Sequence, residues 1–573
     1  MLKNSDTTMK QLWLALSEDA KASSNNSVFV NPMRRYDLAT DNIQSFRSRV
    51  YTHDFMTEDP YKFKWEVQLD ALFKRYKFSN DSFEEKVLDT QASAKFKADQ
   101  VRISGPLSLS WKTKLVLHEA RKIVREVLGR FNEEEHESLC KLSSHANRGV
   151  PYNQAFFDIK VKRLTGSVEH MEWFRNYLKK DGILNHAVHE KGAPRYVPYD
   201  CLRLAKVPKS WKAVRTMMPH TVCGSFYTYG IGLMIRQRLL DAGQDISNLQ
   251  ERHKMLARKF SISRTHATAD LSSASDSFNR ELLCRLLPRA WYTKIMFGNP
   301  RYYEDDGIKY SLQSSMTMGM GHTFPLQTLL FSSLLKAVQM LSGINGLISV
   351  YGDDLIYPRR MHKFVVPIFS ELNFCINLEK TFVSTHFRES CGGDYYRGID
   401  VRPFSPEGRT QHLSRIPYLE FLYKLWNGLR LRWEECEIPR TLHFLLTEIV
   451  NASNVVHQVP PSYPATAGLH MPKPRKPGLI PWSPVAVDAH GLFTFHYLKR
   501  VGKDRTIFSE GIHYWHCLRN KEHAHHSSDL YGSSRPLLRC KKLRRGKKVL
   551  FITIEDDKSG FRPLSQTGRD LWS

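Results

Sequence analysis

Two adjacent aspartates lie at the centre of an alternating apolar stretch, residues 347–357, with the sequence LISVYGDDLIY. Apolar side chains recur at every second position on both sides of the acids, a pattern typical of β-strands. Gly352 followed by Asp353 favours a tight turn, because glycine tolerates positive φ and aspartate bonds its own backbone. We therefore expect a β-hairpin with Asp353 and Asp354 at its tip. Neighbouring carboxylates repel each other and a cation relieves that repulsion, although an ordinary solvated turn fits this stretch equally well.

A third carboxylate, Asp270, follows a strand-like stretch that begins at residue 267. Burying a carboxylate at the end of an apolar strand is costly unless it is paired or bound to a metal, so Asp270 is a candidate ligand. The serines that follow are expected to cap a helix running through Leu282 and Leu286. Asp276 would then lie in the first helical turn, where favourable helix-dipole chemistry is the alternative to a role in a site.

Four cations recur at every third position in the segment 204–215, namely Lys206, Lys209, Lys212 and Arg215. Pro208 argues against a regular helix through this segment, so we expect an extended or hairpin arm. Such an arm suits triphosphate oxygens, with the arginine making a forked contact and the lysines acting as point charges. A solvated basic loop is the alternative.

A glycine-containing loop at residues 314–325 precedes a predicted helix. Thr323 is a suitable N-cap, and Pro325 is tolerated in a first helical turn. An apolar stripe then follows at positions 326, 329, 330, 334, 337, 338 and 341. Gly319 and Gly321 would allow the backbone to come close to a bound strand or nucleotide, whereas a plain junction between loop and helix is the alternative.

The overall charge points to a polyanionic partner. The chain has 573 residues, 41% of them apolar and 25% charged, and a formal net charge of +26. This length predicts several lobes, and the excess of cations favours nucleic acid first and anionic membrane second. No apolar run reaches the ~20 residues that span a bilayer, and the N-terminal segment does not resemble a signal peptide. The nine cysteines are odd in number and scattered, which fits a reducing cytoplasm.

Other segments are less specific. Residues 111–131 predict an amphipathic helix whose cations Lys114, Arg121 and Arg125 form a solvated face, and residues 226–240 predict a buried helix. The proline-rich segment 459–484 predicts an irregular linker. The His-rich segment 513–526 matches no metal-binding spacing, and the basic run 535–548 suits phosphate contacts.

The order of these features resembles the right-hand nucleic-acid polymerases, and several strings resemble the replicase β subunit of the small positive-strand RNA bacteriophages, the leviviruses. These strings are residues 207–209, 268–277, 351–354, 380–382, 387–392 and 396–401. The resemblance is dense between residues 204 and 404. It implies an α+β fold with fingers, a palm made of an antiparallel sheet plus helices, and a thumb. The implied division is 1–200 for an N-terminal region and fingers, 201–260 for fingers with the basic arm, 261–404 for the palm, and 405–573 for the thumb and a basic C-terminal region.

The chemistry implied by this resemblance is nucleotidyl transfer from ribonucleoside triphosphates on an RNA template, with release of pyrophosphate and without a primer. Two Mg²⁺ ions, with Mn²⁺ as a substitute, suit hard oxygen ligands, and Asp270, Asp353 and Asp354 are the expected ligands. A side chain at Gly352 is expected to crowd the hydroxyl of the growing end. Lys380 is expected to protonate the departing pyrophosphate.

Further contacts to the nucleotide follow from the same resemblance. The triphosphate is expected to meet the basic arm of Lys206, Lys209, Lys212 and Arg215. The ribose 2′-hydroxyl is expected to meet Asp276 and Ser275, and the template–nucleotide pocket is expected to be shaped by Gly319, Gly321 and Thr323. Two positions depart from the family pattern: Gln327 stands near the place where many viral RNA polymerases have asparagine, and Gly393-Asp394 replaces a small residue and histidine.

Two alternatives to an RNA-directed RNA polymerase remain. A reverse transcriptase shares three such aspartates, but Gly352 and Asp276 favour RNA synthesis, since reverse transcriptases usually have a bulkier residue before the paired acids. A non-catalytic RNA-binding protein accounts for the charge but not for the carboxylates. The family resemblance also implies host elongation factors Tu and Ts, ribosomal protein S1, and the cytoplasm of an infected bacterium.

Overall fold

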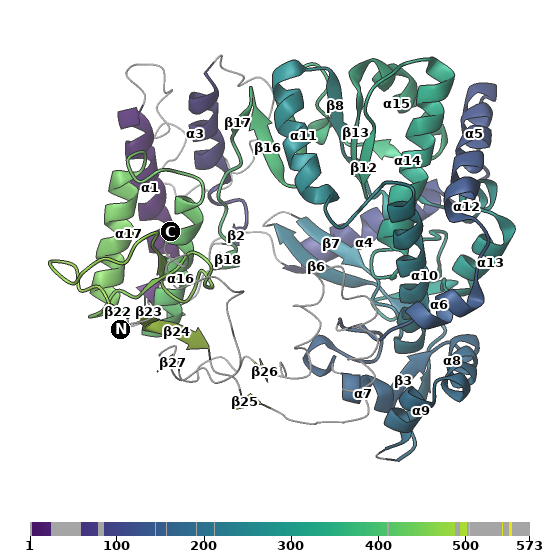
Figure 1. The fold of residues 1–573 in the computed structure, drawn as a ribbon, viewed down its shortest axis with the longest axis horizontal. Coiled ribbons are helices and arrows are strands. Elements are labelled where there is room, and N and C mark those ends of the chain that lie inside the picture. The colour runs from purple at the N-terminus through teal and green to yellow at the C-terminus, as the bar shows by residue number, and fades with distance from the viewer. Residues whose placement is uncertain are drawn as a thin grey trace.

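The computed structural model describes residues 3–23, 59–77, 85–143, 145–155, 157–190, 192–210, 213–409, 412–487 and 493–500, and short strands at 503–504, 541–542 and 549–552. The His-rich segment 513–526 lies outside the described residues, as does most of the basic run 535–548. None of the described helices is both long enough and apolar enough to cross a membrane. The described chain forms a larger and a smaller lobe, which lie side by side (Figure 1).

Residues 85–400 form the larger lobe. Its helices are α4 (Glu85–Arg102), α5 (Trp111–Leu128), α6 (Glu133–Leu139), α7 (Phe157–Lys162), α8 (Val168–Lys180), α9 (Gly182–His189), α10 (Val222–Asp241), α11 (Leu249–Ser263), α12 (Arg280–Leu286), α13 (Arg289–Phe297), α14 (Thr323–Ser342) and α15 (His362–Glu371). Its strands are β3 (Arg163–Gly166), β4 (Arg195–Pro198), β5 (Leu202–Arg203), β6 (Ala205–Ser210), β7 (Ala213–Met217), β8 (His266–Ala269), β9 (Leu271–Ser272), β10 (Tyr302–Asp305), β11 (Ile308–Ser311), β12 (Ser349–Tyr351), β13 (Asp354–Pro358), β14 (Cys375–Ile376), β15 (Phe387–Ser390), β16 (Gly393–Tyr396) and β17 (Ile399–Asp400).

The remaining elements come from both ends of the described chain. The helices are α1 (Ser5–Ser23), α3 (Pro60–Ala71), α16 (Arg415–Arg430) and α17 (Pro439–Ala452). The strands are β1 (Lys3–Asn4), β2 (Tyr76–Lys77), β18 (Gly408–Arg409), β19 (His412–Leu413), β20 (Gln458–Val459), β21 (Leu469–His470), β22 (Val485–Val487), β23 (Phe493–Phe495), β24 (Tyr497–Arg500), β25 (Lys503–Asp504), β26 (Lys541–Lys542) and β27 (Val549–Ile552).

A three-stranded antiparallel sheet of order β12-β13-β8 lies at the centre of the larger lobe. Its register pairs Val350 with Leu355 and Leu355 with Ala269, and all three side chains are buried. Helices cover this sheet, which confirms the predicted α+β class and its antiparallel sheet packed with helices.

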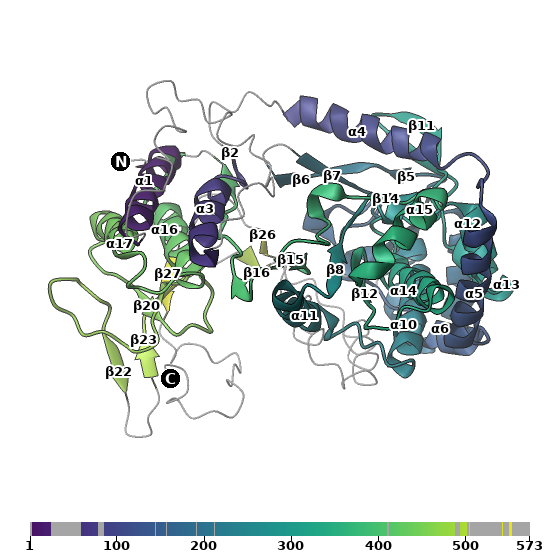
Figure 2. The same cartoon turned by 90° about the horizontal axis from the view of Figure 1, so that it is seen from above.

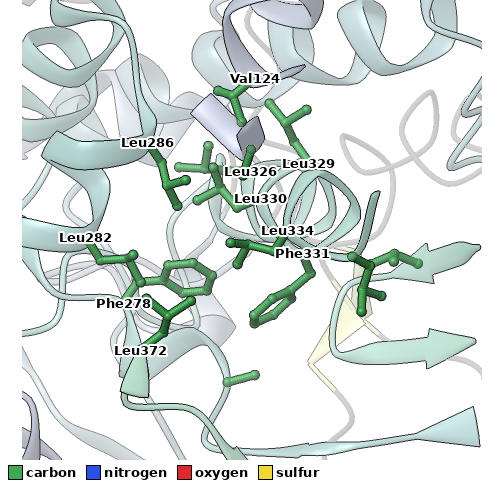
Figure 3. Close-up of a cluster of buried hydrophobic side chains, with 14 of the residues drawn as sticks. Val124, Phe278, Leu282, Leu286, Leu326, Leu329, Leu330, Phe331, Leu334 and Leu372 are labelled. Carbon is green, nitrogen blue, oxygen red and sulfur yellow. The ribbon is translucent and has the colours of Figure 1, made fainter. Parts of the chain in front are cut away.

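Helix α14 is the main support of the sheet. The predicted apolar stripe is present, but the helix is buried on nearly all sides, since Gln327, Thr328 and Ser332 are covered as well as the leucines. A helix in the interior of a lobe needs no polar face. Figure 3 shows Leu326, Leu330 and Phe331 of α14 among side chains from α5 and α12, so one continuous apolar core joins these helices to the sheet.

The smaller lobe joins the two ends of the chain in a single core. Trp13 of α1 and Leu69 of α3 are buried with Tyr423 of α16 and Leu445 of α17. The Asp19 carboxylate accepts hydrogen bonds from the backbone N–H groups of Arg440 and Thr441 at 3.0 and 2.8 Å, which caps the start of α17. The regions predicted from the sequence follow chain order, so they place α1 and α3 in residues 1–200 and α16 and α17 in residues 405–573. In the structure these four helices share one core.

The predicted helices are present with shifted boundaries, and two predicted caps were wrong. Helix α5 begins after the Ser110 cap and ends at Leu128, three residues earlier than the expected end, and α10 contains the predicted buried helix. The expected serine caps do not cap α12, because Asn279 accepts the hydrogen bond from Leu282 N at 2.9 Å. Thr323 is the first residue of α14, not its cap, and its hydroxyl donates to the Thr317 carbonyl at 2.8 Å.

Candidate active site

The predicted hairpin is formed by β12 and β13. Tyr351 pairs with Asp354, which leaves Gly352 and Asp353 as a two-residue turn. Gly352 has φ of +63°, a conformation that glycine adopts without strain. Its N–H donates to the Thr328 hydroxyl of α14 at 2.9 Å, so the turn is held against the helix below it. Asp353 is therefore at the tip, and Asp354 is the first residue of the returning strand.

Asp270 directly follows β8, on the other side of β13. Because Leu355 pairs with Ala269, the next position in the register places Asp270 across from Asp354. The Asp270 carboxylate accepts a hydrogen bond from Asn377 Nδ2 at 2.9 Å and lies 3.4 Å from Lys380 Nζ. The structure thus brings together the three carboxylates predicted as ligands.

Burial and mutual repulsion act on these acids. Burial and the charge of Asp270 raise the pKa of Asp353, against a backbone hydrogen bond and the charges of Lys380 and Arg215. Burial, followed by the charges of Asp353 and Glu389, raises the pKa of Asp354 to about 7. A bound divalent cation would neutralise the negative charge of these desolvated carboxylates and so remove the repulsion between them.

The donor chemistry fits Mg²⁺ or Mn²⁺, since the three side chains supply only hard carboxylate oxygens. Among the described residues, no three carboxylate, imidazole or thiol side chains already stand close enough together to enclose a metal ion. The ion pair between Lys380 and Asp270 occupies one of the three acids. The three carboxylates therefore lie close together on the sheet, but their oxygens do not converge on a single point.

The basic arm is an antiparallel hairpin of β6 and β7, as predicted. Burial, together with the charges of Lys380 and Arg215, lowers the pKa of Lys209, while Asp270 and Asp353 oppose this effect. Asp270 and Asp353 thus act on Lys209, and Arg215 acts on Asp353, so both cations lie within electrostatic reach of the carboxylates. The arm therefore delivers two cations to the acidic hairpin.

The other two cations of the arm are placed differently. Lys206 Nζ lies 3.2 Å from Asp305 and 3.0 Å from Asp306, both at the turn between β10 and β11. Lys206 therefore anchors the arm to a neighbouring sheet instead of facing the carboxylates. Lys212 lies outside the described residues.

Lys380 lies in the one-turn 3₁₀ helix Leu378–Lys380. Burial lowers its pKa, but the charges of Asp270 and Glu389 and the hydrogen bond to Asp270 outweigh burial, so the pKa is raised overall. The ammonium group therefore stays protonated beside the carboxylates at neutral pH. It is a cation that can both neutralise charge and give up a proton.

Ser275 and Asp276 lie in the 3₁₀ turn Ser275–Ser277, next to the sheet but on a separate element. Burial, followed by the charge of Asp99, raises the pKa of Asp276 to about 7, and the nearby Ser275 hydroxyl acts in the opposite direction. The Asp276 carbonyl accepts a hydrogen bond from the Ser314 hydroxyl at 2.5 Å. The turn is thus fixed to the start of the glycine loop.

The glycines of that loop are required by packing within the protein. A Cβ on Gly319 would stand 2.3 Å from the Met218 carbonyl oxygen, and a Cβ on Gly321 would stand 2.6 Å from Tyr229 Cα of α10. Thr323 is buried and bonded inside the same loop. These three residues therefore seat the loop on α10 and on the end of β7, directly before α14.

One protein family has a model that matches residues 84–475 of this chain, and its description is RNA replicase, beta-chain. The match covers more than half of the chain and includes the acidic hairpin, the basic arm and the glycine loop. The chain belongs to this family. The expectation from the replicase-like strings is thereby confirmed.

Curated relatives of this replicase β-chain come from bacteriophages. The RNA-directed RNA polymerase beta chain of Escherichia phage MS2 is 38% identical over 198 residues, 35% of this chain and 36% of that protein. The RNA-directed RNA polymerase subunit beta of Escherichia virus Qbeta is 36% identical over 200 residues, 35% of this chain and 34% of that protein. The matched segment thus spans about a third of the length of each relative.

Solved structures similar to the replicase β-chain are polymerases of other viruses. An RNA-dependent RNA polymerase of BmCPV at the elongation state has a TM-score of 0.35 at 13% identity, over 60% of this chain and 33% of that one. A deletion mutant of the human picobirnavirus RNA-dependent RNA polymerase has a TM-score of 0.29 at 14% identity, over 64% of this chain and 86% of that one. Because both TM-scores are low, nothing further is inferred from them.

Two site residues of this replicase β-chain escaped the sequence analysis. Glu389 of β15 acts electrostatically on Asp354 and Lys380, and Asn377 bonds Asp270 through both its side chain and its backbone N–H. Both lie in short strings that also contain Lys380 or the 387–392 motif. An extra acid in such a string was the available signal, and the bond from the Cys391 N–H, two residues after Glu389, to the Asp354 carboxylate at 3.2 Å shows where the segment lies.

Replacing Asp276 by asparagine tests its buried charge through pH. The folded pKa of about 7 exceeds the unfolded value near 3.8, so its contribution to stability is fully present below about pH 4 and is lost as pH rises through 7. Wild type should therefore gain stability relative to Asp276→Asn as pH falls from 8 to 5.5, by about 2 kcal/mol. Thermal midpoints at the two pH values measure this difference. The same change at exposed Asp241 is the control and should show no such trend, and parallel curves for wild type and Asp276→Asn would contradict the prediction.

Gly352→Ala should destabilise the turn more than its conformation alone requires. Gly352 and Gly343, the C-cap of α14, both have φ of +63°, but a Cβ on Gly352 would lie 2.6 Å from the Phe324 ring whereas Gly343 has open space. Gly343→Ala should cost about 1 kcal/mol for its backbone, and Gly352→Ala clearly more. Thermal midpoints compare the two variants. Adding Phe324→Leu should recover part of the loss only for Gly352→Ala, and equal losses for both glycines would contradict this account.

Proposed function

We propose that this replicase β-chain is an RNA-directed RNA polymerase that copies a viral positive-strand RNA genome. The observation that carries the proposal is the meeting of Asp270, Asp353 and Asp354 on one sheet with Lys209 and Arg215 from the basic hairpin. Carboxylates for a dication beside cations for a triphosphate are the two requirements of nucleotidyl transfer. The names of the phage relatives and the net charge of +26 support RNA as the template.

The proposed reaction is attack by a 3′-hydroxyl on the α-phosphorus of a ribonucleoside triphosphate, with pyrophosphate leaving in line. Two Mg²⁺ ions held by Asp270, Asp353 and Asp354 would lower the pKa of the hydroxyl and neutralise charge on the leaving group. Lys209 and Arg215 orient the triphosphate oxygens, with the arginine as a fork and the lysine as a point charge. Lys380, which pairs with Asp270 in this structure, would be the proton donor for pyrophosphate if Asp270 held a metal ion instead.

The sugar is read, in this proposal, by the turn that carries Ser275 and Asp276. A hydroxyl and a buried carboxyl offer both a donor and an acceptor to the ribose 2′-hydroxyl. The glycine loop supports this turn through the bond from Ser314 to the Asp276 carbonyl. Gln327 is buried in the first turns of α14, the helix that directly follows this loop, and we assign it a supporting role.

The wider biological setting is proposed on family membership alone. It comprises initiation without a primer, host elongation factors Tu and Ts and ribosomal protein S1 as partners, and the cytoplasm of an infected bacterium as the location. These features are attached to no described residue.

The test is incorporation by the chain purified from a bacterial host together with the proteins that accompany it. With an RNA template and Mg²⁺, ribonucleotides should be incorporated at least about a hundredfold faster than deoxyribonucleotides, because the 2′-hydroxyl is a recognised group. Equal or preferential use of deoxyribonucleotides would favour a reverse transcriptase. RNA binding without any incorporation, with Mg²⁺ or Mn²⁺, would favour a non-catalytic RNA-binding protein.

A further inference from the structure

Helix α5 has one face in the core and one face in solvent. Val116, Ala120 and Val124 are buried, and Figure 3 shows Val124 beside Leu326 and Leu329 of α14. The opposite face is fixed in direction by this packing. Its side chains therefore form a permanent surface of the larger lobe.

Cations run along the solvent face of α5 in one line. Lys114, His118, Arg121 and Arg125 are all exposed, at spacings of four, three and four residues, which places them on one side of a helix at steps of about 5–6 Å along its axis. Lys122, beside this line, pairs with Glu119 at 2.8 Å. Lys114, Arg121 and Arg125 make no ion pair with any residue that the structure describes. Like charges in a line repel each other, and a polyanion relieves that repulsion.

An aromatic side chain stands at the start of the same line. Trp111 is 67% exposed and Leu115, one turn later, is 44% exposed. A solvent-exposed indole is unusual, because tryptophan normally buries most of its surface. An indole next to a row of cations suits a nucleic acid whose bases are unpaired, since a base can stack on the ring while phosphates meet the cations.

The line lies away from the acidic hairpin. Helix α14 is between α5 and the sheet of β8, β12 and β13, and α5 occupies the outer edge of the larger lobe in both views (Figures 1 and 2). RNA held on α5 is therefore a different stretch of RNA from the one at Asp353.

We propose that Trp111, Lys114, His118, Arg121 and Arg125 form a second surface for single-stranded RNA, which holds template outside the active site. The proposal rests on the proposed function for the identity of the polyanion. An acidic protein would also be attracted by the cations, but its charges would not need to repeat along an evenly spaced line that ends in an exposed indole. Single-stranded RNA uses both.

The test compares two triple variants that lose the same charge. Lys114→Gln with Arg121→Gln and Arg125→Gln removes the line, and Lys86→Gln with Lys179→Gln and Lys363→Gln removes three exposed cations from other helices. Binding of a 40-nucleotide unstructured RNA is measured by fluorescence anisotropy at several salt concentrations. The first triple should bind about tenfold more weakly near physiological salt, and its salt slope should fall by about 2, since each single-strand phosphate contact contributes about 0.7. The control triple should stay within twofold of wild type.

Trp111→Ala separates RNA from an acidic protein partner. It should weaken RNA binding about fivefold and leave the salt slope unchanged, because stacking releases no counterions. Equal effects of the two triples, or wild-type affinity in both the first triple and Trp111→Ala, would overturn the proposal. The proposal would also be overturned if an acidic host protein that purifies with wild type were lost from the first triple while the RNA affinity of that triple stayed unchanged. Incorporation by wild type, measured separately, reports on the proposed function alone, so the two failures are distinguishable.

Discussion

Asp353→Asn should lose nucleotide incorporation by at least about 10³-fold while the protein stays folded and still binds RNA. Asp353 is at the hairpin tip, and its charge is disfavoured by desolvation and by the charge of Asp270 in the free protein. Asparagine keeps the shape and removes the negative charge that a dication requires. Incorporation of labelled ribonucleotides and anisotropy with RNA measure the two properties in one preparation.

The same variant should lose activity without losing stability. Without a divalent ion, Asp353→Asn should be at least as stable as wild type, because a charge that Asp270 repels is gone. Addition of Mg²⁺ should raise the thermal midpoint of wild type and should not raise that of the variant. Asp241→Asn, an exposed acid at the end of α10, should behave as wild type in both assays. Near-normal incorporation by Asp353→Asn would remove this residue from the catalytic machinery.

Arg388→Met should cause the largest loss of stability among the substitutions considered. Arg388 is fully buried, and its guanidinium donates hydrogen bonds to the carbonyls of His266, Val383, Thr385 and Phe387 at 2.5–3.0 Å. Burial, with the charges of Arg264 and Arg359, lowers the pKa of Arg388 to about 10, so it remains charged at neutral pH. It ties β8, the strand that Asp270 follows, to the start of β15 and the segment before it.

Methionine fills a similar volume but leaves four buried carbonyls without a donor, which should cost about 3–5 kcal/mol. The thermal midpoint should fall by about 5 °C or more. Arg388→Lys should be intermediate, since an ammonium group cannot reach all four carbonyls as a planar fork does. Arg285→Met, which breaks an exposed pair with Glu281, is the matched control and should change the midpoint by about 1 °C. Equal midpoints for Arg388→Met and Arg285→Met would show that these carbonyls find other partners.

The parts of this fold that could be predicted are those with local causes. The alternation around Gly352 and Asp353 predicted the hairpin, and the apolar spacing predicted α5, α10 and α14. The basic arm was predicted as a hairpin because Pro208 excludes a regular helix. Asp270 was found because it ends an apolar strand. Each of these inferences depends only on residues within a single helix, strand or hairpin.

The parts that could not be predicted depend on contacts between distant residues. Lys206 and Lys209 look equivalent in the sequence, yet Lys206 pairs with Asp305 and Asp306 about 100 residues later. Gly319 and Gly321 look alike in the sequence, yet a Cβ on Gly319 would meet the Met218 carbonyl and a Cβ on Gly321 would meet α10, contacts that no local pattern indicates. The core shared by α1 and α17 joins segments more than 400 residues apart, as the bond of Asp19 to Thr441 shows. Local periodicity contains no information on such pairings.

Template-directed addition of a single nucleotide tests the central claim most directly. Four RNA templates that differ only at the first uncopied base are offered, each with all four ribonucleotides, to the purified wild-type chain and its accompanying proteins. The account predicts that each template directs its complementary nucleotide, only when Mg²⁺ or Mn²⁺ is present, and that EDTA stops the addition. Addition that ignores the template base, or that continues at the same rate in EDTA, would contradict the assignment of Asp270, Asp353 and Asp354 as the metal-binding centre of an RNA-directed RNA polymerase.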